Sequence, residues 1–238
     1  MKYSPNTLAI SLTNRCELNC SFCSRDSRYD DGSELDHELV ARTLVEARDL
    51  KIKRVEFTGG NAFLSKYLKP HLQYATDIGF ESRGILSNCN IANPYMKFEE
   101  LKSSGLNTLG LSIDCEHLSA IYRSKKDMVS ANRIVKDSLK AATQLFPVVN
   151  VKSVWRDLKE RKKNRFLLYS LVQELYDDLE IVKFENQGLE AILMNSRKNK
   201  ILLEEIACNP LGRHKKSDRE KLHYSQLGNC KLDLKTIY

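Results

Sequence analysis

The chain has 238 residues, 42% of them hydrophobic, and a formal net charge of +7. This length suits one large domain, or one domain with a small appendage, and the composition is that of a globular protein with a core. No run approaches the roughly eighteen consecutive apolar residues that cross a bilayer, and there is no signal-peptide pattern, so we expect a cytoplasmic protein without a membrane partner. Seven cysteines, three of them clustered, fit a reducing compartment.

Strand and helix patterns alternate along the chain. In chain order they predict strands over residues 8–12, 54–58, 81–86, 109–113, 148–154 and 180–184, and helices over 39–50, 64–78, 95–103, much of 127–145 and much of 157–176. This alternation predicts an α/β fold with parallel strands, in an open sheet or a barrel, whose following loops meet at one ligand-binding rim. Alternation does not decide whether Asn150 and Lys152 face the inside.

A cluster of three cysteines follows the first predicted strand. Cys16, Cys20 and Cys23 form a Cys-x-x-x-Cys-x-x-Cys run. Thiolates this close in sequence are typical of a metal site, and no Cys or His pair lies nearby to complete structural zinc. Three thiolates suit a cubane iron–sulfur cluster with one iron open to a chelating ligand, which favours catalysis. The alternative is three unrelated thiols in an exposed turn.

With Thr-Asn-Arg before it and the aromatic Phe22 just before the third cysteine, this motif resembles the signature of the radical S-adenosylmethionine (radical SAM) superfamily. The resemblance implies a [4Fe–4S] cluster held by the three cysteines and SAM bound to its open iron, with Phe22 by the adenine. One electron would cleave SAM to methionine and a 5′-deoxyadenosyl radical that abstracts hydrogen from a substrate. It further implies a partial six-stranded (β/α) barrel over about residues 5–190, and an electron donor such as flavodoxin or ferredoxin.

A second motif, Gly59-Gly60-Asn61, follows the second predicted strand. Two glycines let a backbone approach a ligand closely and free its amides, although a plain strand-to-helix turn is the alternative. The position is similar to the family's Gly-Gly-Glu motif, which contacts the amino group of SAM. Asn61 departs from that motif, because it keeps a carbonyl acceptor and loses the charge.

Two further strand ends resemble SAM-binding segments of the family. Asn88 matches the Asn of its Thr-Asn-Gly segment, and Ser112 with the downstream Arg123 matches a Ser-x-Asp segment followed by His and Arg. The resemblance implies that Asn88, Ser112 and Arg123 help to hold SAM. An Asx turn at Asn88 and a surface helix position for Arg123 are the alternatives.

The tail contains two more cysteines, Cys208 and Cys230. Gly212-Arg213 followed by a later cysteine resembles the entry to the auxiliary-cluster (SPASM or twitch) extensions of the family, but two cysteines do not fill the four positions of a second cluster. We therefore expect a radical SAM core over residues 1–190 and a short C-terminal extension over 191–238. This extension resembles a degenerate or truncated SPASM or twitch extension.

The expected activity is radical SAM chemistry on a small-molecule or peptide substrate. No side chain is named as catalytic, because the cofactor supplies the radical. Basic runs at residues 152–165 and 213–221 are interpreted as solvated faces rather than a nucleic-acid groove. The alternatives are a binding or regulatory protein that keeps the cluster without turnover, and an RNA-modifying member of the same family.

Overall fold

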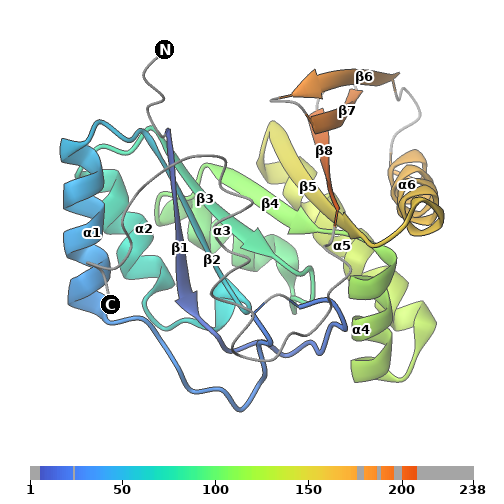
Figure 1. Ribbon diagram of the computed structural model, residues 1–238, viewed down its shortest axis with the longest axis horizontal. Helices are drawn as coiled ribbons and strands as arrows, with labels where there is room; N and C mark the ends of the chain where they lie inside the picture. Colours follow the sequence, from blue (N-terminus) through green and yellow to red (C-terminus); the bar gives the residue numbers. More distant parts are fainter. Residues whose placement is uncertain (1–5, 24, 176–179, 187–188, 196–199, 208–238) are drawn as a thin grey trace.

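The protein is built on one twisted sheet flanked by helices (Figure 1). A computed structural model describes residues 6–23, 25–175, 180–186, 189–195 and 200–207. Its strands are β1 (Thr7–Thr13), β2 (Arg54–Gly59), β3 (Ser82–Ser87), β4 (Thr108–Ser112), β5 (Val148–Trp155), β6 (Glu180–Asn186), β7 (Leu189–Asn195) and β8 (Lys200–Ala207). Its helices are α1 (His37–Asp49), the short 3₁₀ helix η1 (Ala62–Leu64), α2 (Leu68–Asp77), α3 (Pro94–Ser103), α4 (Cys115–Lys125), α5 (Met128–Leu145) and α6 (Leu158–Gln173).

The strand order is β1-β2-β3-β4-β5-β8-β7-β6. Strands β1 to β5 and β8 run parallel, which confirms the predicted α/β fold with six parallel strands. The sixth parallel strand is β8, whereas the strand predicted at 180–184 is β6, which pairs with β7 in an antiparallel hairpin. The expected boundary after residue 190 lies within β7, and the division into core and extension stays a prediction.

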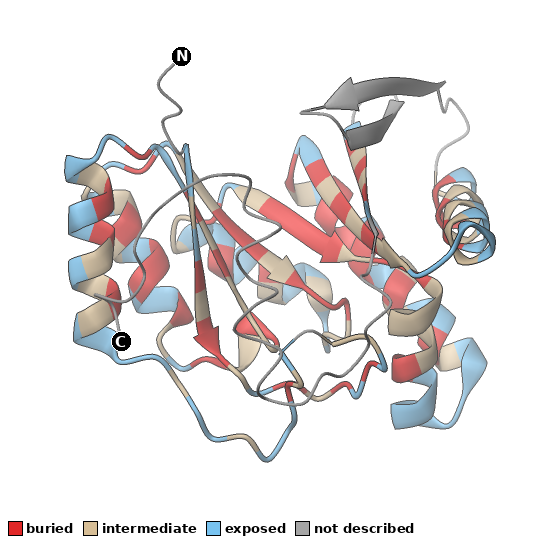
Figure 2. Ribbon diagram, viewed as in Figure 1, coloured by how far each residue is buried: buried red, intermediate tan, exposed pale blue. Residues whose placement is uncertain are grey.

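One face of the sheet is buried under helices. Phe57, Ile85, Leu109 and Val149 lie side by side in register on four neighbouring strands, and all are fully buried (Figure 2). Helix α2 packs on β3, and α5 and α6 pack on β5. Bulky apolar side chains at alternate strand positions therefore form the core between sheet and helices.

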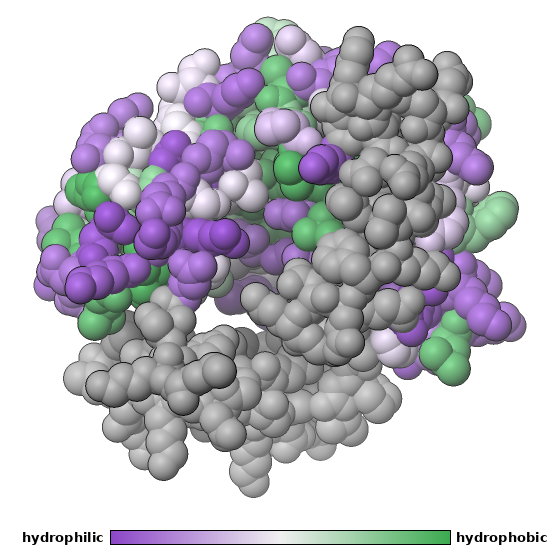
Figure 3. Space-filling model, turned by 90° about the horizontal axis from the view of Figure 1, so that it is seen from above, coloured by the Kyte–Doolittle hydropathy of each residue, from purple (hydrophilic) through white to green (hydrophobic). Residues whose placement is uncertain are grey.

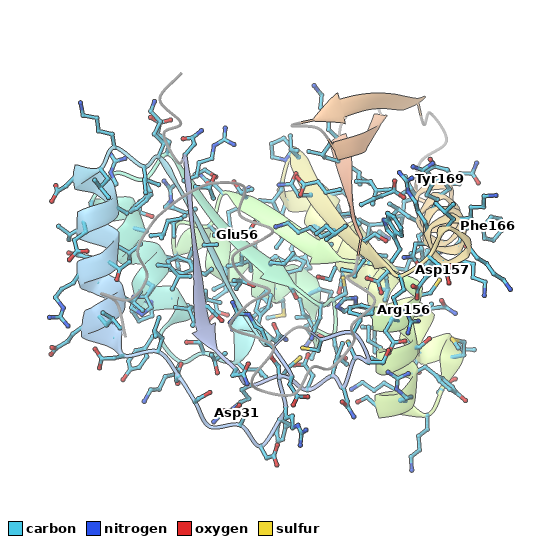
Figure 4. All side chains as sticks on the ribbon, viewed as in Figure 1. Asp31, Glu56, Arg156, Asp157, Phe166 and Tyr169 are labelled. Carbon is cyan, nitrogen blue, oxygen red and sulfur yellow. The ribbon has the colours of Figure 1, made fainter. Side chains whose placement is uncertain are left out.

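Asn150 and Lys152 lie on the opposite face of the sheet, because the alternating residues Val149 and Val151 are buried on the helix side. This face also carries apolar side chains, such as Leu86 and Leu202 in the same cross-strand row as Asn150. Lys152 Nζ forms an ion pair with Glu56 across the sheet, at 2.8 Å from Oε1. Glu56, labelled in Figure 4, lies on β2, next to the edge strand β1. Asn150 and Lys152 therefore face away from the helices, which strand alternation alone did not decide. This face of the sheet leads to the rim where the strands end.

Two helices differ from the sequence prediction. Helix α4 is absent from the sequence prediction. Asp114 caps its N-terminus, because Asp114 Oδ1 accepts a hydrogen bond from His117 N (2.8 Å). The helix predicted over 64–78 begins only at Leu68, because Asn61 caps the separate 3₁₀ turn before it. Both differences arise from capping side chains that also lie at strand ends.

Hydrophilic side chains cover much of the described surface in the view of Figure 3, with apolar ones scattered between them. Within the residues that the structure describes, no helix is both long and apolar enough to cross a membrane.

A buried histidine should make the stability of the protein depend on pH. His71 in α2 is 1% exposed, and burial, followed by the nearby His37, lowers the pKa of His71 from 6.5 to about 4. The unfolded chain binds the proton more tightly, so stability should fall by about 2 kcal/mol between pH 7.5 and pH 5. Urea unfolding at both pH values should show this loss, and His71→Phe should reduce it. Equal losses in the two proteins would contradict the assignment.

Candidate functional site

The three clustered cysteines lie in the loop that leaves β1, at the carboxyl end of the strand. The Cys16 N–H donates to the Arg28 carbonyl (3.0 Å), and the Cys23 N–H donates to the Cys20 carbonyl (3.2 Å). The Leu35 N–H donates to Leu12 O (2.7 Å), so the chain comes back to β1 after the cysteines. Backbone hydrogen bonds therefore close this segment into a folded cysteine loop, here defined as residues 14–23.

The sulfur atoms of this loop are largely withdrawn from water. Cys16 and Cys20 are buried and Cys23 is half-buried. Burial raises the pKa of the Cys16 thiol to about 11 and raises that of Cys20 still further, and repulsion among the three neighbouring sulfurs adds to the effect. Two N–H groups already point at sulfur: Asn88 Nδ2 donates to Cys16 Sγ (3.5 Å), and Ser27 N donates to Cys23 Sγ (3.4 Å).

Gly59, the last residue of β2, and Gly60 hold the cysteine loop against the sheet. Gly60 N–H donates to Thr13 O (2.7 Å), so this amide, expected to be free for a ligand, is already bonded. A Cβ at Gly60 would lie 2.6 Å from the Arg15 carbonyl carbon, and Gly59 adopts φ +147° with its missing Cβ directed at the Thr13 backbone. The observed use of both glycines is close approach of two backbones.

Asn61 is buried and bonded at both ends of its amide. Its Oδ1 accepts from Phe63 N (3.2 Å). Its Nδ2 donates to both carboxylate oxygens of Glu17, at 2.9 and 3.1 Å, and lies 3.5 Å from Asn88 Oδ1. Asn61 thus joins the end of β2 to the cysteine loop and to the end of β3.

Asn88, after β3, contacts the same group of residues. Its Oδ1 accepts from Asn90 N (3.1 Å), which is the Asx turn considered as an alternative, while its Nδ2 points at Cys16 Sγ. The next residue, Cys89, has φ +67° and is fully buried, with its thiol directed at Ser112 O (3.7 Å). The turn therefore directs one face of Asn88 to the cysteine loop.

The end of β4 approaches the loop from the other side. Ser112 is the last residue of β4, and Asp114 follows as the buried cap of α4. Asp114 Oδ2 lies 2.7 Å from His117 Nδ1, and the His117 ring meets Phe22 edge-on with centroids 5.3 Å apart. Burial opposes the charge on each, yet their mutual attraction lowers the pKa of Asp114 and raises the pKa of His117. Phe22 thus packs against a histidine ring whose Nδ1 lies within hydrogen-bond distance of Asp114.

Arg123 contacts the cysteine loop itself. Its Nη2 donates to Asn19 O (3.0 Å) and to Glu116 Oε1 (2.8 Å). Glu116 Oε1 also accepts from Ser21 N (2.9 Å), and although burial acts against it, these contacts hold the pKa of Glu116 below its usual range. Arg123 lies in α4, as its alternative interpretation assumed, and in this structure it fastens that helix to the loop.

The structure therefore brings the predicted residues of four strand ends to one rim. Sequence reasoning missed Glu17, Glu116 and the Glu56–Lys152 pair, whose partners are distant in the chain. A cavity of about 330 Å³ opens beside the loop, and it is lined by Cys16, Glu17, Leu18, Asn19, Ser27, Arg28 and Tyr29. Cys208, Cys230 and the Gly212-Arg213 pair lie outside the described residues.

Known proteins share both the sequence pattern and the fold. The radical SAM superfamily model matches residues 10–155. A probable GTP 3′,8-cyclase of Pyrococcus abyssi is 26% identical over 194 residues, 74% of this chain and 60% of that protein. A GTP 3′,8-cyclase of Syntrophomonas wolfei is 30% identical over 113 residues, 46% of this chain and 34% of that protein. The chain thus spans about half the length of the curated relatives it matches.

Among solved structures, coproporphyrinogen III oxidase from Escherichia coli, described as a radical SAM enzyme, superposes with a TM-score of 0.50 at 14% identity. The match covers 87% of this chain and 45% of that one, and at this identity it speaks for the fold alone. The superfamily model, by contrast, covers more than half of the chain and includes the whole cysteine loop. The chain therefore belongs to the radical SAM superfamily.

Proposed function

We propose that Cys16, Cys20 and Cys23 ligate a [4Fe–4S] cluster, and that SAM bound beside it yields a radical which abstracts hydrogen from a small-molecule or peptide substrate. Members of the superfamily use this cluster and SAM. The observation that carries the proposal is the position of the three thiols in one folded loop at the carboxyl ends of the parallel strands.

The sulfur environment fits such a cluster. Neutral thiols are only weak acceptors and gain little from the two N–H donors aimed at them, whereas thiolates bound to iron are stabilised by such hydrogen bonds. A bound metal also reverses the effect of burial, because it deprotonates its thiol ligands outright. Among the described residues no three His, Cys, Asp or Glu side chains converge on a single-ion site.

SAM would lie among the strand ends that surround the cysteine loop. The proposed contacts are Phe22, Gly59, Gly60, Asn61, Asn88, Ser112 and Arg123. When bound, the cofactors supply an electron and a 5′-deoxyadenosyl radical, and no protein base is needed for hydrogen abstraction. Since the Gly60 amide and both ends of the Asn61 amide are bonded within the protein, we expect Gly59 and Gly60 to contribute backbone carbonyls.

A small-molecule substrate is favoured by two observations. The relatives are named GTP 3′,8-cyclases, although this chain matches only about half their length. The face of the sheet opposite the helices leads to the rim and carries the Glu56–Lys152 ion pair, whose groups suit a polar metabolite. We propose that this pair orients the substrate. The radical SAM core at residues 1–190, the extension at 191–238, a flavodoxin or ferredoxin donor and a cytoplasmic location remain predictions.

The test is anaerobic reconstitution with iron and sulfide, followed by SAM and a strong reductant. We expect 5′-deoxyadenosine and methionine in equal amounts, measured by chromatography. A protein that binds the cluster and SAM but forms no 5′-deoxyadenosine, even with a metabolite and peptide mixture present, would support the binding or regulatory alternative. RNA retention at low salt that is lost steeply with added salt would support the RNA-modifying alternative.

A further inference from the structure

Glu17 is the carboxylate nearest in sequence to the cluster thiols, and its position is fixed. Both of its oxygens accept from Asn61 Nδ2, at 2.9 and 3.1 Å. The same Nδ2 approaches Asn88 Oδ1, and Asn88 Nδ2 in turn donates to Cys16 Sγ. A chain of three side chains therefore links the Glu17 carboxylate to a cysteine sulfur.

Asn61 has little capacity left for a ligand. Its Oδ1 is taken by the Phe63 amide, which also fixes which end of the side chain is oxygen, because a backbone N–H requires an acceptor there. Its Nδ2 is taken by Glu17. Asn61 thus offers no free acceptor for an amino group.

Glu17, in contrast, keeps acceptor capacity and faces open space. A carboxylate has about four acceptor sites, and the two hydrogen bonds from Asn61 Nδ2 leave about half of them for a ligand. Glu17 is half-buried and lines the 330 Å³ cavity together with Cys16. The cavity therefore places an anionic acceptor next to a cluster ligand, where hydrogen bonds from a cationic or amino donor are strong.

We propose that Glu17 receives the α-amino group of SAM and that Asn61 is its positioning residue. This inference rests on the proposed function and reassigns one contact within it. The Gly-Gly-Glu resemblance places a carboxylate at position 61, where this chain has an amide. In this proposal the carboxylate comes from position 17, and the amide of Asn61 is its hydrogen-bond partner. The site would thereby retain its negative charge despite Asn61.

The test measures binding by anaerobic equilibrium dialysis of the reconstituted protein, with two probes: SAM, and the SAM analogue that lacks the α-amino group. We expect Glu17→Gln to weaken SAM binding at least about 10-fold, as expected for loss of a charge-assisted hydrogen bond, and to leave the analogue within about twofold. Iron content should not change, since Glu17 binds no iron. The exchange Glu17→Asn with Asn61→Glu should restore the preference for SAM.

Glu34→Gln is the matched control, because it removes the same charge from a carboxylate that bonds Ser65 Oγ (2.5 Å) away from this cavity. It should leave both affinities unchanged. Equal weakening of SAM and the analogue by Glu17→Gln, or an unchanged preference for SAM, would overturn the role of Glu17 while the wild-type protein still forms 5′-deoxyadenosine. A wild-type holoprotein that binds neither probe would overturn the proposed function as well.

Discussion

Cys20→Ala is expected to abolish cluster binding. Cys20 is the middle cysteine of the loop, it is buried, and its sulfur interacts electrostatically with those of both Cys16 and Cys23. A cubane cluster in this loop depends on all three protein thiolates, and two of them do not hold it. We expect about four irons per wild-type chain after anaerobic reconstitution and close to none in the variant, by iron and sulfide analysis and visible absorption.

Cys115→Ala is the matched control within the described residues. Cys115 begins α4, and its thiol is half-buried with a pKa raised by burial, but it is outside the cysteine loop. This variant should keep its iron, as should Cys208→Ala in the tail. Iron loss of the same size in the Cys20 and Cys115 variants would refute the ligand assignment, because it would show that any lost thiol destabilises the protein.

Most of the parallel sheet is predictable from the sequence because each strand carries its own local signal. Buried residues such as Phe57 and Leu109 alternate with polar ones, and helix stops such as Gly79 and Gly105 separate the elements. The position of β6 in the sheet, in contrast, has no local sequence signal. Strand β6 pairs with β7 in a hairpin, and the position beside β5 is taken by β8, which lies beyond the predicted core.

The candidate site likewise has features that the local sequence predicts and contacts that it does not predict. The spacing of the three cysteines and their position after a strand are visible in the sequence, so the rim was predictable. The partner of Glu17 is 44 residues away, and that of Glu116 is 95 residues away, so no local pattern indicates either contact. For the same reason the contacts of Arg123 with Asn19 and Glu116 are not predictable from the sequence, and its contact with SAM stays a prediction.

Residues with different sequence signals share one function here, because each of them holds part of the cysteine loop in place. Gly60 holds the beginning of the cysteine loop to β2, Asn61 and Glu17 hold its middle to β2 and β3, and Glu116 with Arg123 holds its end to α4. A loop that binds a cluster must keep its thiolates in place before iron arrives, and such fixed geometry comes from neighbouring rigid elements. The loop is therefore positioned from three directions.

Gly60→Ala is expected to show how strongly cluster binding depends on this positioning. The added Cβ would lie 2.6 Å from the Arg15 carbonyl carbon and 2.8 Å from Asn14 O, both in the backbone of the cysteine loop. Because a backbone does not rotate away as a side chain does, the loop must move or the Gly60 N–H bond to Thr13 O must break. We expect a loss of about 2–3 kcal/mol in urea unfolding, and loss of most of the reconstituted iron.

Gly32→Ala provides the comparison, since a Cβ at Gly32 meets nothing within 4 Å. Its free energy of unfolding should stay within about 0.5 kcal/mol of the wild type, with full iron content. The two variants add the same methyl group, so any difference between them measures the contact and not the alanine. Full iron content in Gly60→Ala would mean that the cysteine loop binds its cluster independently of β2, and that its three thiols alone determine the site.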